Sequence, residues 1–190
     1  AFGGTVDFSA ATVNGLPAGA TGLESGTGTS SMQSAASLTA TAAIASGSNS
    51  IALGDSAQAL SASGIAIGNN SNAWFTAVAI GSSARCVNSQ EAIAIGQAAT
   101  CTTTRAIAIG SQSDATATSA IALGYFAQAT ATGAVALGTA VTAATDNTTT
   151  VNLLQIAGYA GMNYPDDPTA AIGGIPLGGV YHTDGALKIR

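Results

Sequence analysis

The sequence predicts an all-β fold, a parallel β-roll or β-helix solenoid whose rungs are about 14 residues long. The first observation is a five-residue apolar phrase that recurs seven times, from SIALG at 50–54 to AVALG at 134–138. The second is its spacing of 14, 13, 15, 14, 14 and 14 residues, in which one short and one long step cancel. The third is composition: only 5% of residues are aromatic and 7% are charged, which suits stacked small side chains better than a globular core. The phrases close on the repeat glycines Gly54, Gly68, Gly81, Gly96, Gly110, Gly124 and Gly138.

Each phrase is expected to form one short strand. Large residues alternate with alanine, as in Ile51-Ala52-Leu53, and a period of two with β-branched side chains is typical of a strand. A helix would need apolar spacings of three and four, which the phrase lacks. The closing glycine is expected to supply a positive φ angle or a tight corner.

A second alternating pair of small residues lies three and five positions after each glycine, as in Ala57 and Ala59. Each rung is therefore expected to hold two short strands and two turns, with one wall of large residues and one of small residues. Neighbouring rungs are expected to lie about 4.8 Å apart. The small-residue wall is flat and carries few polar groups, so we expect another copy of the chain to cover it. We therefore expect a homotrimer with these walls at its axis.

The repeat divides the chain into three segments. Residues 1–46 lack it and are expected to hold short strands, a degenerate first rung and an attachment segment that a partner orders. Residues 47–145 contain the repeats, in seven or eight rungs, and residues 146–190 form a neck-like or cap segment. The irregular N- and C-terminal segments are expected to protect the open sheet edges.

The pattern x-(A/S)-(I/V)-A-(I/L)-G-x-x-A-x-A at a period of 14 residues resembles the head repeat of trimeric autotransporter adhesins, the YadA-like head. The resemblance covers about 90 residues and implies left-handed β-rolls packed three around a common axis. Members of that family continue into a neck, a coiled-coil stalk and a membrane anchor. Here DNTTTVNLLQIAG at 146–158 resembles the beginning of a neck, but no heptad stalk follows it.

Both ends of the chain resemble modules of bacteriophage tail-fibre and head-decoration proteins, in VDFSAATVNGLPAG at 6–19 and GGIPLGGVYHTDGALKIR at 173–190. With no stalk, anchor or leader visible, these resemblances favour a structural protein of the virion surface. It would be a short trimeric fibre or capsid-decoration protein, held to capsid or tail proteins through residues 1–46 and contributing to host adhesion. The alternative is the head of a bacterial surface adhesin that binds host ligands.

Charge excludes two classes of partner. The net charge is −5, and only four residues are basic. The chain therefore cannot form a basic face that neutralises nucleic-acid phosphates, and it cannot form a basic amphipathic helix that binds a membrane surface. Membrane insertion is also not expected, because the chain lacks a run of about 20 strongly apolar residues. Host-surface glycans or proteins remain as partners besides the homotrimer and the virion.

Cys86 and Cys101 both lie five residues after their glycines and are expected to stack on neighbouring rungs. Strands about 4.8 Å apart bring Cα atoms within the range of a disulfide. The alternative is a pair of buried free thiols that act as small apolar residues. Metal binding is not expected, because two cysteines with no histidine nearby make only half of a zinc site.

Two aromatic pairs and one pair of opposite charges also depart from the repeat. Trp74-Phe75 and Tyr125-Phe126 occupy turns about 19 Å apart, where they suit either a trimer seam or contact with a glycan or protein. Glu91 and Arg105, each five residues before its glycine, are expected to stack as a cross-rung pair. Such a pair, if solvated, contributes less than about 1 kcal/mol.

No catalytic constellation, cofactor site or metal site is expected, so we interpret the protein as a non-enzyme. His182 has no nucleophile and orienting acid converging on it, and Asp184 nearby does not supply them. The glycines follow the rung period and form no phosphate-binding loop. Asp166-Asp167 between prolines is typical of a turn. Hydrolysis of a polysaccharide would require paired carboxylates, and the roll offers only the scattered Asp55, Glu91 and Asp114.

Overall fold

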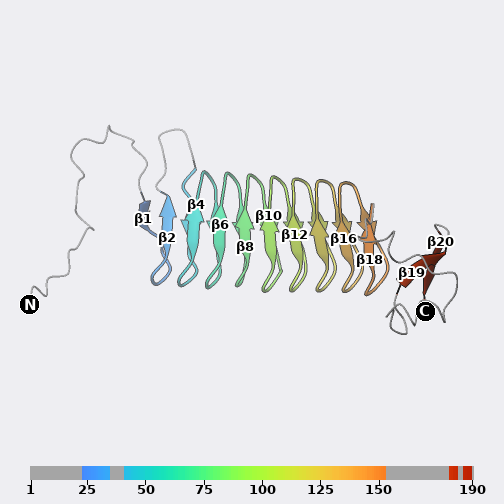
Figure 1. The fold of residues 1–190 in the computed structure, drawn as a ribbon. Helices are drawn as coiled ribbons and strands as arrows, with labels where there is room; N and C mark the ends of the chain where they lie inside the picture. The colour runs from blue at the N-terminus through green and yellow to red at the C-terminus, as the bar shows by residue number, and fades with distance from the viewer. Residues whose placement is uncertain (1–22, 35–40, 153–179, 184–185, 190) are drawn as a thin grey trace, which may run out of the picture. The chain divides into compact units, whose positions relative to one another are not determined.

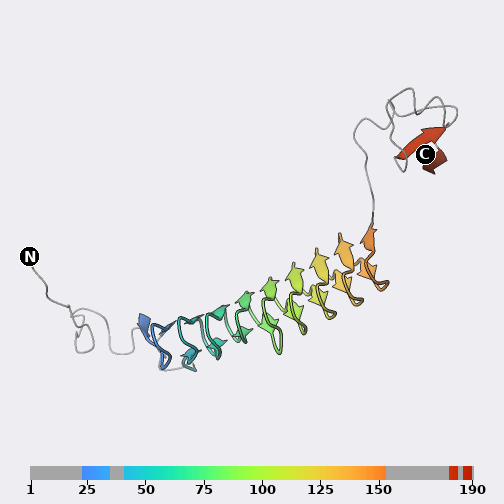
Figure 2. The same cartoon turned by 90° about the horizontal axis from the view of Figure 1, so that it is seen from below.

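The computed structural model describes residues 23–34, 41–152, 180–183 and 186–189, and the predictions made for 1–22, Asp166-Asp167 and Asp184 lie outside them. Within these ranges the chain forms the predicted parallel β-roll, in which two sheets face each other (Figures 1 and 2). The chain alternates between the sheets, so each rung contributes one strand to each. The shorter sheet has eight strands, which agrees with the predicted seven or eight rungs.

The longer sheet has ten strands. They are β1 (Leu23–Ser25), β2 (Met32–Ser34), β4 (Ile51–Leu53), β6 (Ile65–Ile67), β8 (Val78–Ile80), β10 (Ile93–Ile95), β12 (Ile107–Ile109), β14 (Ile121–Leu123), β16 (Val135–Leu137) and β18 (Thr149–Val151). The shorter sheet contains β3 (Ile44–Ala45), β5 (Gln58–Ala59), β7 (Asn72–Ala73), β9 (Arg85–Cys86), β11 (Thr100–Cys101), β13 (Asp114–Ala115), β15 (Gln128–Ala129) and β17 (Thr142–Ala143). All neighbours from β2 to β18 pair in parallel, residue on equivalent residue, as in Ile93 on Ile107 and Thr100 on Asp114.

The roll extends beyond the predicted limits of 47–145. Its first rung begins at β2 and its last described strand is β18. At the N-terminal end β1 pairs antiparallel with β2, and the side-chain oxygen of Gln33 accepts a hydrogen bond from the backbone N–H of Ala45 at 3.0 Å. β1 therefore covers the edge of β2 that would otherwise be open. A separate unit, residues 153–190, contains the antiparallel pair β19 (Val180–Thr183) and β20 (Ala186–Ile189).

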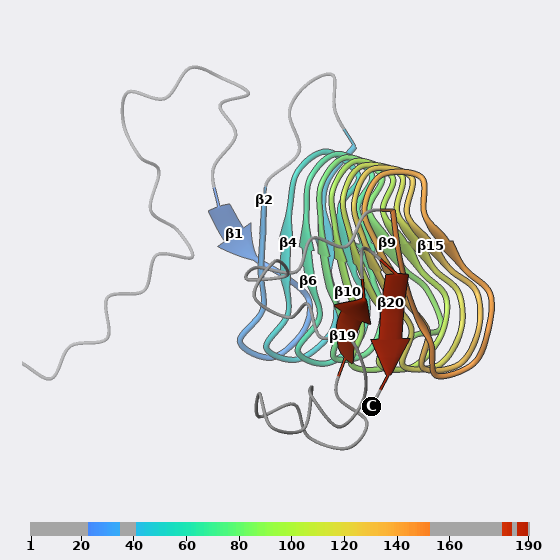
Figure 3. The ribbon, with the colours of Figure 1, turned by 45° about the vertical axis from the view of Figure 1, so that its right-hand side comes forward.

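Figure 3 shows the two sheets enclosing the interior of the roll. The buried side chains between them are small, and nearly all are alanine. The middle residues of the long-sheet strands are fully buried: Ala52, Ala66, Ala79, Ala94, Ala108, Ala122 and Ala136. The second residues of the short-sheet strands face them and are also fully buried: Ala59, Ala73, Cys86, Cys101, Ala115, Ala129 and Ala143. Alternation along a strand then directs the large residues away from the interior.

The prediction that small-residue walls lie on the outside, at a trimer axis, is therefore wrong. Both sets of small residues pack against each other inside one chain, because the space between sheets that are joined by such short turns admits little more than a methyl group. The outer surface of the long sheet is instead formed by isoleucine, leucine and valine.

The repeat glycines make this stacking possible. Gly110 has a φ of +136°, and a Cβ atom placed on it would clash with the carbonyl oxygen of Gly124 on the next rung. Gly138 has a φ of +126°, but its added Cβ would meet a side chain first, Cγ2 of Val141 at 3.2 Å. The glycine prediction is thus confirmed in its backbone angle, and close approach between rungs is a second reason for the residue.

Candidate functional site

The first candidate surface is the apolar wall, which we define as the outward residues of β4 to β16 in the long sheet. It consists of Ile51, Leu53, Ile65, Ile67, Val78, Ile80, Ile93, Ile95, Ile107, Ile109, Ile121, Leu123, Val135 and Leu137. Each of these side chains is half-buried or exposed, up to 47% for Leu137. Two straight rows of large apolar side chains thus run along the roll with nothing from the described chain covering them.

The second surface is the polar face, formed by the outward residues of β5 to β17 in the short sheet. It consists of Gln58, Asn72, Arg85, Thr100, Asp114, Gln128 and Thr142. Side chains on this face bond from rung to rung: Asn72 Nδ2 donates to Gln58 Oε1 at 3.1 Å, and Thr142 Oγ1 donates to Gln128 Oε1 at 3.5 Å. This surface is polar and needs no cover from water, although Asn72 Oδ1 is buried without a hydrogen-bond partner.

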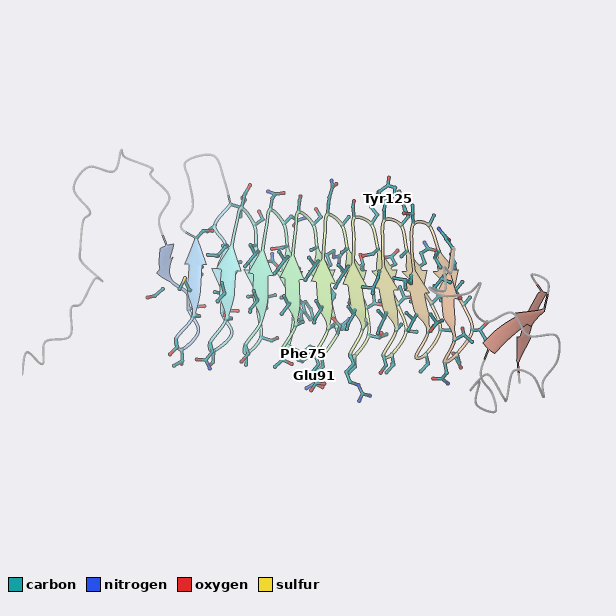
Figure 4. All side chains as sticks on the ribbon, in the orientation of Figure 1. Phe75, Glu91 and Tyr125 are labelled. Atoms are coloured by element: carbon teal, nitrogen blue, oxygen red, sulfur yellow. The ribbon has the colours of Figure 1, made fainter. Side chains whose placement is uncertain are left out.

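Two edges join these faces. The upper edge contains the turns that follow the repeat glycines, and the lower edge contains the turns that lead back to the long sheet (Figure 4). Each rung places one residue per edge in the left-handed region, except that the lower turn 87–92 has two, Asn88 and Glu91. On the upper edge these residues have φ angles of 54–57°: Ser56, Asn70, Ser83, Ala98, Gln112, Phe126 and Ala140. None is β-branched, since such side chains are genuine outliers at positive φ.

Tyr125 and Phe126 lie on the upper edge, where Figure 4 shows Tyr125 projecting from the roll. Their rings meet edge to face, with centroids 4.4 Å apart, and are 51% and 41% exposed. Phe126 holds the left-handed position that Gln112 and Ala140 hold on the neighbouring rungs. An exposed ring on a strained backbone is a feature that folding alone does not require.

Trp74 and Phe75 lie on the lower edge, in the shortened turn 74–77 between β7 and β8. The next lower turn, 87–92, has one extra residue, so the deletion and the insertion are neighbours and the strands stay in register. Phe75 is 46% exposed with a φ of 56°, whereas Trp74 is half-buried. Only Phe75 of this pair therefore offers an open ring.

Cys86 and Cys101 face each other directly across β9 and β11, as predicted, and both are fully buried. The structure holds them as free thiols. Cys86 Sγ donates to the carbonyl of Val78 at 3.3 Å and Cys101 Sγ to that of Ile93 at 3.2 Å. Whether the pair oxidises stays a prediction.

Glu91 and Arg105 lie on neighbouring turns of the lower edge, both exposed and both with positive φ. Their stacking agrees with the predicted register, since the N–H of Arg105 donates to the carbonyl of Gln90 at 2.8 Å. Within the described part of the chain no side-chain ion pair joins them within 4.0 Å. The solvated alternative fits this geometry better.

The carboxylates of the roll lie on different surfaces. Asp55 is on the upper edge, where Oδ1 accepts from the N–H of Thr41 and Oδ2 from Asn69 Nδ2, whereas Glu91 is on the lower edge and Asp114 on the polar face. Across the described ranges no three His, Cys, Asp or Glu side chains converge in a way that would hold a metal ion. His182 lies in β19 opposite Leu187.

No helix in the described ranges has the length and apolar character needed to cross a membrane. The arrangement supports surface contact, through a wall that needs cover and edges that carry exposed rings. The sequence analysis predicted a wall of large residues but missed that this wall faces outward, while the small residues of both sheets bury each other.

Comparison with known proteins agrees with this geometry. A family model described as the YadA head domain repeat (2 copies) matches residues 45–71, 88–113 and 115–140, so this part of the chain is similar to YadA head repeats. The matched segments cover most of the rungs, and the gap between the first two contains the shortened turn. No curated protein matches the chain.

Proposed function

We propose that the chain, which is similar to the YadA head repeat family over residues 45–71, 88–113 and 115–140, is one protomer of a homotrimeric, rod-like adhesive head. The family is structural and adhesive, and its head domains form surface-exposed homotrimers. The observation that carries the proposal for this chain is the apolar wall, whose two rows of large side chains extend over seven strands.

The wall fits a three-fold interface. Contiguous apolar surface of this extent is rare on monomeric proteins and marks a site of association. Closed symmetry is the common form of homo-oligomers. Three parallel rolls with their walls inward would keep equivalent rungs at equal heights, so each large apolar residue would meet its own copies along the axis. The polar face would then form the outer surface of the rod.

Ligand contact in this arrangement is assigned to the edges. A three-fold axis parallel to the rod keeps heights equal, and Phe75 and Tyr125 lie four rungs, or about 19 Å, apart. The two aromatic sites therefore cannot pack on each other across a seam. Each faces either the neighbouring protomer at its own height or a ligand, and a host-surface glycan or protein is the ligand that exposed aromatic rings suit.

The test uses the full chain and a double variant, Tyr125→Ser with Phe126→Gln, which copies Ser111-Gln112 of the preceding rung. Binding to host cells and to immobilised extracellular matrix is measured together with oligomeric state. We expect binding to fall at least tenfold while the trimer persists. Loss of the trimer would instead assign the rings to the seam, and unchanged binding would remove them from the adhesive surface. The matched control, Ser111→Ala on the same edge, should leave both unchanged.

We propose that a virion carries the rod, because both ends of the chain resemble bacteriophage tail-fibre and head-decoration modules. Attachment would then run through residues 1–46, and the protein would have no catalytic role. A bacterial cell surface is the alternative, and the β-roll is equally compatible with it. Gold-labelled antibody against the roll distinguishes them: label on purified phage particles supports the virion, and label confined to the bacterial envelope supports the adhesin.

A further inference from the structure

Cys86 and Cys101 interrupt an interior column that alanine otherwise occupies. The column contains Ala59, Ala73, Ala115, Ala129 and Ala143, and the cysteines are consecutive members between Ala73 and Ala115. A lone thiol would be an ordinary small apolar filler. Two on adjacent rungs, paired residue on residue and both facing inward, create a cross-strand thiol pair in a protein that has no other cysteine.

The two thiols face each other on paired strands, and each also donates to a backbone carbonyl. The neighbouring Cys101 lowers the pKa of Cys86, whereas the neighbouring Cys86 and burial raise the pKa of Cys101. Their Cα atoms lie on neighbouring strands, at a spacing of about 4.8 Å that falls within the 4.4–6.8 Å found in disulfides.

The pair lies where the repeat is least regular. The rung formed by β8 and β9 is flanked by the shortened turn 74–77 and the lengthened turn 87–92. In the described structure, Trp74 Nε1, Ser89 Oγ and Thr103 Oγ1 are buried on three successive lower turns without a hydrogen-bond partner. Unsatisfied polar groups weaken the packing of this part of the roll. A covalent link between β9 and β11 would join the two rungs on either side of the lengthened turn.

We propose that Cys86 and Cys101 form a disulfide that staples these two rungs when the protein matures in an oxidising compartment. The oxidant is a small-molecule disulfide such as oxidised glutathione. Cys86 thiolate attacks it, one glutathione thiolate leaves, and Cys101, after losing its proton, attacks the mixed disulfide and releases the second. Two protons and two electrons leave the protein. Because both thiols are fully buried, exchange takes place before these rungs close or during their local opening.

The test compares the full chain after incubation with oxidised glutathione, in mild denaturant, with the same protein kept in a reductant. Alkylation under full denaturation followed by intact mass measurement counts free thiols. We expect none after oxidation and two after reduction, and we expect oxidation to raise the melting temperature by about 5–10 °C. The double variant Cys86→Ala with Cys101→Ala repeats the alanine of the neighbouring rungs, and its melting temperature should not respond to the oxidant.

Three results would contradict the proposed disulfide. The first is that both thiols remain alkylatable although the oxidised sample refolds, and the second is a covalent link between protomers on a non-reducing gel. The third is a link between Cys86 and Cys101 that leaves the melting temperature unchanged. The single variant Cys86→Ala separates the roles of the two residues. It should retain one alkylatable thiol or carry one glutathione, and it should lose the oxidation-dependent rise in melting temperature.

Discussion

The apolar wall and the polar face are two outward surfaces of one coil, with the same backbone pattern and the same alanine interior. They differ in what alternates with alanine: isoleucine, leucine or valine in the long sheet, and amides, hydroxyls and charged groups in the short sheet. Polar side chains on the polar face bond from rung to rung, as Asn72 does to Gln58, whereas the wall leaves Ile95 and Ile109 exposed by 36% and 39%. The difference indicates that one face is made for water and the other for a second copy of the chain.

The largest effect is expected from a substitution that disrupts the close stacking of the rungs, on which both faces depend. Gly110→Ala should destabilise the roll by more than about 3 kcal/mol, because the methyl group meets the backbone of the next rung at a φ that L-residues rarely adopt. Gly138→Ala is the matched control with the same φ but a side chain as nearest neighbour, and should cost markedly less. Denaturant unfolding measures both. Equal costs would show that close rung stacking is not the reason for the glycine.

A charge on each face should separate the two surfaces. Ile109→Asp places a carboxylate within the proposed interface, where burying it without a partner costs several kcal/mol per protomer, so the trimer should dissociate. Thr100→Asp is the control on the polar face, between Arg85 and Asp114, and should leave the trimer intact. Analytical ultracentrifugation reads out both variants. A stable trimer of Ile109→Asp would refute the assignment of the wall.

Truncation should give the same contrast at a smaller scale. Ile109→Ala should lower trimer stability by about 1–2 kcal/mol per protomer, because it removes apolar area that association buries. Thr100→Ala should stay within about 0.5 kcal/mol, as is usual for exposed positions. Concentration-dependent thermal melts measure the difference. Equal effects of the two truncations would mean that the faces are energetically alike.

The smallest expected effect concerns the edge between the faces. Phe126→Asn should raise stability by about 0.5–1 kcal/mol, because asparagine tolerates the left-handed conformation that phenylalanine adopts there at a cost. Ser83→Asn, at the same place on another rung, should change little. Chemical denaturation of the intact trimer is the measurement. A clear loss of stability would show that the Phe126 ring packs into a seam.

Much of this fold could be predicted from the sequence, because a 14-residue period and strict alternation determine strands, rungs and register. The stacking of Cys86 on Cys101 and the placement of Trp74-Phe75 in an irregular turn follow from counting residues. Counting residues does not reveal which wall faces inward, because alternation only separates the side chains of a strand into two sets. Only the width of the interior decides that, and it follows from the short turns.

Other features have weaker signals. The left-handed positions on both edges are occupied by residues as different as Ser56, Glu91 and Phe126, so composition does not reveal them. The sequence indicates the first rung only as a degenerate one, because Gln33 stands at the interior position where the next rung carries Ala52. The handedness implied by the family resemblance stays a prediction.

The central claim is that the apolar wall closes a homotrimer. Size-exclusion chromatography with light scattering on the full chain tests it most directly. A single species with three times the 18.2 kDa chain mass is the predicted result, with the species lost in Ile109→Asp and retained in Thr100→Asp. A monodisperse species at 18.2 kDa would contradict the claim, because the wall would then lie exposed to water.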